Sequence, residues 1–250
     1  MTPIIKISFC IIFCAIQFFV QAQQMPYSVA NAHSHNDYLQ QHPFYAAYQN
    51  GFGSMEVDVH LANGDLLVAH SAKNLDVNET LEVLYLIPLS KIKKTSHSLQ
   101  LLIDIKTAPI ATLEALISIL KKYPSIIENE DIRIVISGNR PDESAYTNYP
   151  SFIWFDGRLE KSYTTEQLEK IALISDDYGR FTSRMKKERM SHAARDKIIA
   201  AIEKAHVMRK PVRLWGSPDV PAVWAELQQL QVDYINTDQI EALAAYLKTK

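Results

Sequence analysis

The stretch Leu101-Leu102-Ile103-Asp104-Ile105-Lys106 is an almost continuous apolar run that carries two charged residues at its end. A run of this length without polar–apolar alternation is typical of a parallel strand that is covered on both faces. The residues that follow, 109–122, predict a helix, because Pro109 is favoured in a first helical turn. One buried strand followed by one helix is the repeating unit of α/β folds.

The same unit recurs along the rest of the chain. We expect strands at 28–32, 54–59, 66–69, 101–105, 132–137, 152–155, 171–175, 212–215 and 234–235. We expect helices at 43–50, 81–93, 109–122, 165–169, 191–209, 222–230 and from Asp238 onward. About eight such units without a linker predict an α/β fold, a single (β/α)8 TIM-type barrel over residues 23–250. The alternative is a doubly wound open sheet, which is disfavoured because no Gly-rich phosphate-binding loop occurs.

Residues 1–22 have the pattern of a secretory signal peptide. Lys6 is followed by an apolar run over 7–20, and small residues at Val20 and Ala22 suit a cleavage site. The alternative is a membrane anchor, but the run is short for about 20 spanning residues and Gln17 interrupts it. We therefore expect an exported protein, periplasmic or secreted, with no stable membrane span after cleavage.

Composition and cysteine placement exclude several classes of function. Both cysteines, Cys10 and Cys14, lie in the predicted signal peptide, so the remaining chain can form neither a thiol nucleophile nor a cysteine-ligated zinc site. A lipid-modified Cys14 would make a lipoprotein, but the bulky Phe13 stands where a small residue is wanted. The chain has 250 residues and a formal net charge of −2, so it offers no basic field for nucleic acid. We expect a monomer that acts on a small molecule.

Polar residues gather where the predicted strands end, which is where barrels carry their catalytic side chains. These segments are His33-Ser34-His35-Asn36-Asp37, Glu56-Val57-Asp58, His70, Asp104-Ile105-Lys106, Trp215-Gly216 and Asn236-Thr237-Asp238. The sequence therefore predicts a site at the carboxyl ends of the strands.

A divalent metal site is predicted from the carboxylates of this set. Glu56 and Asp58 are two residues apart on a strand, so both side chains point to the same face. Two such carboxylates repel each other unless a cation neutralises them. A hard ion, Mg²⁺ or Ca²⁺, suits oxygen ligands, and Asp104 could supply a third. The alternative is a set of salt bridges to lysines at the barrel rim.

Two histidines flank the acidic residues in sequence, and we expect His33 and His70 to form an acid–base pair. Phosphodiester cleavage needs such a pair: one imidazole would take a proton from an attacking hydroxyl, and the other would protonate the leaving oxygen. Lys106 and the metal would offset charge on the phosphate. The alternative for each histidine is a structural, hydrogen-bonded side chain. We expect His35, Asn36 and Trp215 to contact the substrate, core packing being the alternative for Trp215.

Several of these segments resemble the glycerophosphodiester phosphodiesterase family, within the superfamily of phospholipase-C-like barrel phosphodiesterases. The similar segments are Ala32-His33, residues 51–59, residues 63–70, residues 102–106, residues 212–215 and residues 234–238. The resemblance implies that His33 and His70 are the acid–base pair, that Glu56, Asp58 and Asp104 bind a metal, and that Lys106 contacts phosphate. It also implies attack by a neighbouring substrate hydroxyl, which gives a cyclic phosphate.

The chain departs from the family pattern at three places. Ser34 stands where the family usually has arginine, and residues 35–38 replace its Pro-Glu-Asn-Thr motif. Only 33 residues separate His70 from Asp104, too few for the small inserted domain of the glycerol-specific enzymes. Asp104-Ile105-Lys106-Thr107 is closer to the sphingomyelinase D branch. The expected substrate is thus a glycerophosphodiester or another phospholipid-derived phosphodiester.

Two other functions compete with this interpretation. His33-x-His35 also resembles the opening of amidohydrolases and related histidine-rich metal hydrolases, but no histidine occurs between His97 and His192 to complete such a site. A secreted barrel could instead bind a phosphorylated ligand without turnover. The two retained imidazoles favour an enzyme over a binding protein.

Overall fold

The computed structural model describes residues 27–95, 97–183 and 190–249. The predicted signal peptide at 1–22 lies outside the described residues. Within the described part of the chain, no helix is long and apolar enough to cross a membrane.

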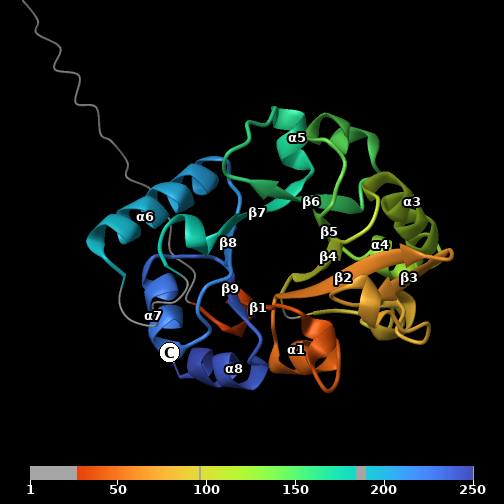
Figure 1. The fold of residues 1–250 in the computed structure, drawn as a ribbon, viewed down its shortest axis with the longest axis horizontal. Coiled ribbons are helices and arrows are strands. Elements are labelled where there is room, and N and C mark those ends of the chain that lie inside the picture. The colour runs from red at the N-terminus through yellow and green to blue at the C-terminus, as the bar shows by residue number, and fades with distance from the viewer. Residues whose placement is uncertain (1–26, 96, 184–189, 250) are drawn as a thin grey trace, which may run out of the picture.

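Eight parallel strands form the ring that Figure 1 shows in the centre of the molecule. They are β1 (Ala32–Ser34), β2 (Ser54–Ala62), β4 (Leu99–Ile105), β5 (Ile132–Gly138), β6 (Ile153–Arg158), β7 (Ile171–Asp177), β8 (Val212–Trp215) and β9 (Ile235–Thr237). Neighbouring strands pair in the order β8-β7-β6-β5-β4-β2-β1-β9. A single parallel bridge between Arg213 and Tyr234 joins β8 to β9 and closes the ring. The predicted (β/α)8 barrel is confirmed.

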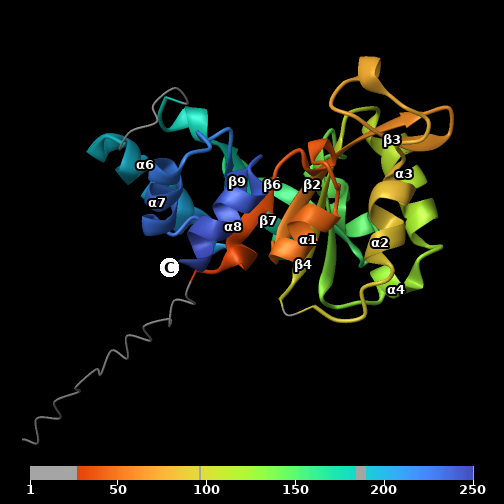
Figure 2. The ribbon, with the colours of Figure 1, turned by 90° about the horizontal axis from the view of Figure 1, so that it is seen from below.

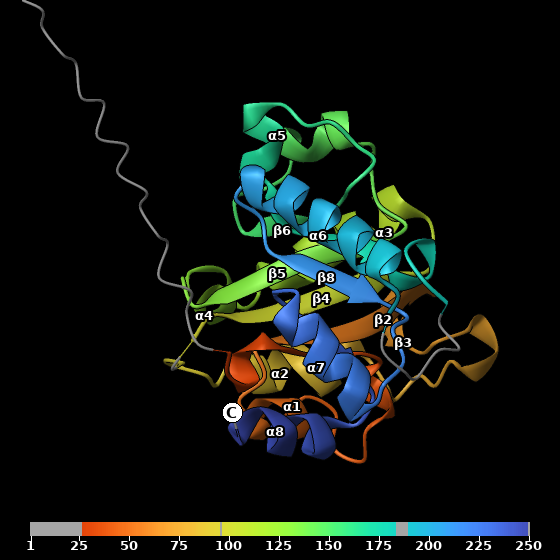
Figure 3. The same cartoon turned by 90° about the vertical axis from the view of Figure 1, so that its left-hand side faces the viewer.

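Helices surround the ring on its outer side. They are α1 (Tyr45–Asn50), α2 (Ile87–Leu89), α3 (Pro109–Leu120), α4 (Pro124–Ile127), α5 (Thr165–Glu169), α6 (His192–Val207), α7 (Pro221–Gln229) and α8 (Ile240–Lys248). Figure 3 shows α6 beside β8, and α7 packs against β9. The short strand β3 (Asp65–Val68) pairs antiparallel with β2 outside the ring and lies against α3 (Figure 2). The helical layer is thin after β5 and β6, where a 3-10 helix at Glu143–Asn148 and the short α5 replace full-length helices.

Two apolar clusters divide the core. The larger one fills the space between the strands and the surrounding helices. The smaller one lies within the ring, where Leu102, Val135, Ala172 and Leu173 are buried and Trp154 packs against them. Because side chains alternate along a strand, Asp104 faces the interior like Leu102 but one layer higher. The ring thus has an apolar floor beneath a polar upper part.

The first strand lies further along the chain than the sequence predicted. Residues Val29–Asn31 form a 3-10 helix that Ser28 caps, and β1 begins only at Ala32. The predicted strand at 28–32 is therefore wrong in its boundaries. As a consequence His33 lies inside the strand, and His35 is the first residue after it.

Candidate active site

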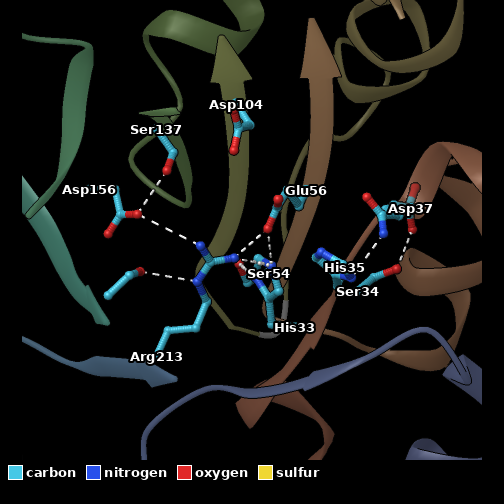
Figure 4. Close-up of polar contacts among 12 residues, drawn as sticks. His33, Ser34, His35, Asp37, Ser54, Glu56, Asp104, Ser137, Asp156 and Arg213 are labelled. Carbon is cyan, nitrogen blue, oxygen red and sulfur yellow. Dashed lines mark hydrogen bonds and ion pairs between the residues drawn. The ribbon is translucent and has the colours of Figure 1, made fainter. Parts of the chain in front are cut away.

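A cavity of about 200 Å³ opens at the carboxyl ends of the strands. It is lined by His35, Asn36, Glu56, Asp58, His70, Asp104, Lys106, Ser137, Arg158, Arg213 and Trp215. Every predicted site residue except His33 belongs to this lining. Figure 4 shows the polar contacts beneath and around it.

The three predicted metal ligands converge from two neighbouring strands. Ligand oxygens of Glu56, Asp58 and Asp104 all lie within 4.8 Å of one another, since Asp58 and Asp104 are register partners on β2 and β4. Asp58 is 1% exposed, and its Oδ1 has no hydrogen-bond partner in the described structure. An unpartnered buried carboxylate oxygen is costly unless it meets a cation. The residues therefore fit a hard divalent ion with oxygen ligands.

Gly138, the last residue of β5, makes room for this cluster. Its φ is +65°, and a Cβ atom there would lie 1.9 Å from Oδ1 of Asp104. Any side chain at this position would both strain the backbone and displace the carboxylate. This glycine could not be singled out from the sequence, because the close approach depends on the pairing of β4 with β5.

Lys106 is the cation that the cluster already contains. Its Nζ lies 3.1 Å from Oδ2 of Asp58 and 3.1 Å from Oδ1 of Asp104. Burial lowers the pKa of Lys106, but these two carboxylates outweigh burial and raise it. Burial raises the pKa of Asp104, and the charges of Glu56 and Asp58 add to that effect. One lysine thus leaves excess negative charge in the cluster.

Arg213, which had no predicted role, holds Glu56 from the opposite side of the ring. It is 3% exposed, donates a hydrogen bond to Oε2 of Glu56 and another, 3.1 Å long, to Oγ of Ser175. Figure 4 shows it reaching from β8 between Glu56 and Asp156. Burial would raise the pKa of Glu56, but the charge of Arg213 and the hydrogen bond to His33 together outweigh burial and hold that pKa well below its usual value. Arg213 shares a strand face with Trp215, and that spacing could have revealed its inward direction.

His33 lies beneath the cavity and does not reach it. Its side chain is fully buried, with Nδ1 2.7 Å from Oγ of Ser54 and Nε2 2.9 Å from Oε2 of Glu56. The Nε2 atom is also 2.7 Å from a guanidinium nitrogen of Arg213. Burial, reinforced by Arg213, lowers the pKa of His33 to about 4. This geometry suits a neutral structural imidazole, the alternative that the sequence left open for each histidine, and the acid–base role of His33 stays a prediction.

His35 and His70 are the imidazoles that line the cavity. Nδ1 of His35 lies 2.9 Å from Oδ1 of Asp238. Burial lowers the pKa of His35, but the hydrogen bond to Asp238 and nearby carboxylate charges outweigh it and raise that pKa. Nδ1 of His70 lies 3.0 Å from Oδ2 of Asp58, and its side chain is 68% exposed. Each ring is thus oriented by a carboxylate through Nδ1.

A buried carboxylate anchors the segment that carries His35. Asp37 is fully buried and accepts hydrogen bonds from Oγ of Ser34 at 2.7 Å, from the backbone N–H of Phe44 at 2.6 Å and from the Tyr85 hydroxyl at 2.9 Å. These contacts fix both ends of the loop between β1 and α1. Asp37 thereby helps to position His35, which lies between Ser34 and Phe44 in the sequence. This role was not predicted from the sequence.

The cavity wall next to the acidic cluster is formed by β5 and β6, the strands that follow β4 in the ring. Oγ of Ser137 donates a 2.9 Å hydrogen bond to Oδ2 of Asp156, which is fully buried. A guanidinium nitrogen of Arg158 lies 3.7 Å from the same oxygen. Asp156 and Arg158 are two residues apart on β6 and share its inward face. Neither residue was singled out from the sequence.

Two protein-family models match the chain. A model described as an AIM6-like phosphodiesterase domain matches residues 23–97, and the glycerophosphoryl diester phosphodiesterase family matches residues 211–241. The resemblance to glycerophosphodiester phosphodiesterases is confirmed. These matches, together with the fold, support an enzyme of the phosphodiesterase type.

Individual proteins similar to the chain agree with the models. Altered inheritance of mitochondria protein 6 from Kluyveromyces lactis is 26% identical, over 87% of this chain and 72% of that protein. The protein of the same name from Eremothecium gossypii is 24% identical, over 87% of this chain and 69% of that protein. The crystal structure of a glycerophosphodiester phosphodiesterase from Parabacteroides distasonis superposes with a TM-score of 0.56 at 13% identity, covering 88% of this chain and 97% of that one. That likeness shows the shared barrel.

Proposed function

We propose that the protein is a divalent-metal-dependent phosphodiesterase that cleaves a glycerophosphodiester or another phospholipid-derived phosphodiester. The observation that carries this proposal is the acidic cluster of Glu56, Asp58 and Asp104, with its unpartnered buried oxygen, in a cavity also lined by two imidazoles. Among the described residues, these three carboxylates are the side chains whose ligand atoms lie close enough together to hold a metal. A ligand set made of carboxylates disfavours a histidine-rich hydrolase.

His35 takes the general-acid role in place of His33. Its hydrogen bond to Asp238 favours the protonated ring, which can then donate a proton from Nε2 to the leaving oxygen. The general-acid role passes from His33 to His35 because, of these two histidines, His35 lines the cavity and His33 does not.

His70 takes the general-base role. With Nδ1 directed at Asp58, its Nε2 is left to accept the proton of an attacking substrate hydroxyl. The described chain presents no cysteine, so attack by a substrate hydroxyl, with a cyclic phosphate as first product, accounts for the reaction without a protein nucleophile.

Charge on the phosphate oxygens is balanced by Lys106 and the metal. Lys106 lies between Asp58 and Asp104, close enough to the cluster to contact a phosphate bound there. A divalent ion held by Glu56, Asp58 and Asp104 would supply Lewis-acid stabilisation of the developing negative charge. Asn36 and Trp215, which also line the cavity, would contact the rest of the substrate.

A small soluble diester with a free hydroxyl near phosphorus suits this cavity. All the lining residues come from one chain, so a monomer suffices to form the cavity. Export through residues 1–22 would place the enzyme where phospholipid headgroups are within reach. The net charge of −2 gives no support for a nucleic-acid substrate.

Phosphorus NMR on a substrate panel tests the proposal. The panel contains glycerophosphocholine, glycerophosphoinositol, a lysophospholipid and sphingomyelin, each incubated with the protein and Mg²⁺ or Ca²⁺. We expect at least one diester to be converted, with a cyclic phosphate signal before or with the final product. Turnover of phosphomonoesters alone would overturn the proposal. Binding without turnover would favour a binding protein.

A further inference from the structure

We propose that the substrate headgroup carries a second anionic group, a carboxylate or a phosphate, which Arg158 binds on the β6 wall of the cavity. This inference rests on the proposed function, because it takes the cavity as the place where the phosphodiester binds.

Arg158 is held in the cavity by its strand and by its own backbone. It is the last residue of β6, and its side chain is 26% exposed. Its backbone N–H donates a 2.7 Å hydrogen bond to the Tyr163 hydroxyl, which in turn donates to the backbone oxygen of Arg158 at 3.3 Å. The guanidinium therefore projects from a fixed point on the barrel rather than from a free loop.

The donors of this guanidinium are not used within the described structure. Its nearest acidic atom, Oδ2 of Asp156, lies 3.7 Å away, which is beyond hydrogen-bond distance. That oxygen already accepts from Ser137, and Arg213 lies 3.7 Å from it on the other side. Asp156 thus steers Arg158 by charge without consuming its donors. A planar fork of this kind suits bidentate contact with a carboxylate or a phosphate.

The other two cations of the lining are already committed. Lys106 is paired with Asp58 and Asp104, and Arg213 is hydrogen-bonded to Glu56. A phosphodiester at the acidic cluster would be served by Lys106 and the metal. Arg158 therefore remains for a separate negative charge on the same ligand. The same residue would repel a headgroup whose far end is cationic.

A matched substrate pair tests the proposal. Glycerophosphoserine and glycerophosphoethanolamine differ by one carboxylate, so the ratio of their kcat/KM values isolates that group. We expect the wild-type protein to favour the serine compound, and Arg158→Gln to reduce this ratio by about 10–100-fold, the usual effect of losing a charge-assisted hydrogen bond. Arg158→Lys should give an intermediate ratio, because it keeps the charge and loses the fork.

Controls and a second pair separate the outcomes. Arg180→Gln should leave the ratio unchanged, since Arg180 lies outside the cavity lining and pairs with Glu160 and Asp176. Glycerophosphoinositol with and without a 4-phosphate tests whether a phosphate serves as well as a carboxylate. Should Arg158→Gln fail to fold, as judged by thermal unfolding, the Arg158→Lys ratio decides.

Three results bear on the inference in different ways. An equal loss of both substrates in the Arg158 variants would overturn it, because Arg158 would then contact the shared diester. Turnover of both substrates without preference by the wild type would also overturn it, while the proposed function would stand. If neither compound is turned over, calorimetric binding decides, and tighter Arg158-dependent binding of the serine compound would support the anion subsite although the proposed function had failed.

Discussion

Nδ1 of His35 lies 2.9 Å from Oδ1 of Asp238, and each residue directly follows the end of its strand. The pairing of β1 with β9 sets Ser34 opposite Thr237, so the next residue on each strand meets its counterpart. A backbone hydrogen bond of 2.9 Å from His35 to Thr237 strengthens this junction. The orientation of the His35 imidazole is therefore set where the first strand, β1, meets the last strand, β9.

Asp238→Asn should shift the alkaline limb of the pH–rate profile to lower pH. Asp238 helps to raise the pKa of His35, and the acid form is lost as pH rises through that pKa. Removing the charge lowers the pKa, so activity should decline at a lower pH than in the wild type. The measurement is kcat/KM against pH on a glycerophosphodiester. Glu160→Gln, outside the cavity lining, is the control, and an unchanged alkaline limb in Asp238→Asn would exclude His35 as the acid.

Substitution of His35 and of His33 should have opposite consequences. His35→Ala and His70→Ala should each lower kcat by about 10²–10⁴-fold with little change in thermal stability. His33→Ala should instead cost about 1–3 kcal/mol of unfolding free energy, because the buried Oγ of Ser54 and Oε2 of Glu56 each lose a hydrogen-bond partner. Urea unfolding beside steady-state kinetics separates the two. A stable but inactive His33→Ala, with an active His35→Ala, would restore the catalytic role to His33.

Arg213→Met should be strongly destabilising. It leaves the carboxylate of Glu56 buried without its main cation, and breaking a buried ion pair from one side costs about 3–5 kcal/mol. Arg180→Gln, which removes an exposed arginine, should change stability by less than about 1 kcal/mol. Chemical denaturation of both variants gives the comparison, and similar small losses in the two would show that Arg213 does not hold Glu56.

Gly138→Ala should weaken divalent-ion binding, whereas Gly64→Ala should not. Both glycines have positive φ, so both variants should lose some stability from backbone strain. Only at Gly138 would the new Cβ collide with the Asp104 carboxylate, since nothing lies within 4 Å of a Cβ at Gly64. Calorimetric titration with Mg²⁺ and with Ca²⁺ measures the difference. Equal affinities in the two variants would remove Asp104 from the metal site.

Several elements were predicted closely from the sequence, and the first strand was not. The strand at 212–215 and the helix at 165–169 match β8 and α5. The first strand was misplaced by four residues because Ser28 and Asn31 cap a 3-10 turn through their side chains. In a three-residue strand such a shift changes which histidine is buried. The burial of His33 and the exposure of His35 to the cavity follow from that boundary.

The contacts between side chains on different strands of the ring could not be predicted from the sequence either. Strand parity could have shown that Arg213 and Arg158 point inward, given Trp215 and the buried strand β6. Which acid each arginine meets depends on ring closure and register, which local patterns do not encode. The metal cluster was predictable because Glu56 and Asp58 share one strand and Asp104 lies on the neighbouring one.

We predict that a divalent ion bound by Glu56, Asp58 and Asp104 is required for cleavage of a phosphodiester. The direct measurement is phosphorus NMR of glycerophosphodiester turnover by the chelated protein during titration with Mg²⁺ or Ca²⁺. We predict no turnover after chelation, recovery with one of the two ions, and no recovery in Asp58→Asn. Turnover that persists unchanged after exhaustive chelation would contradict the account.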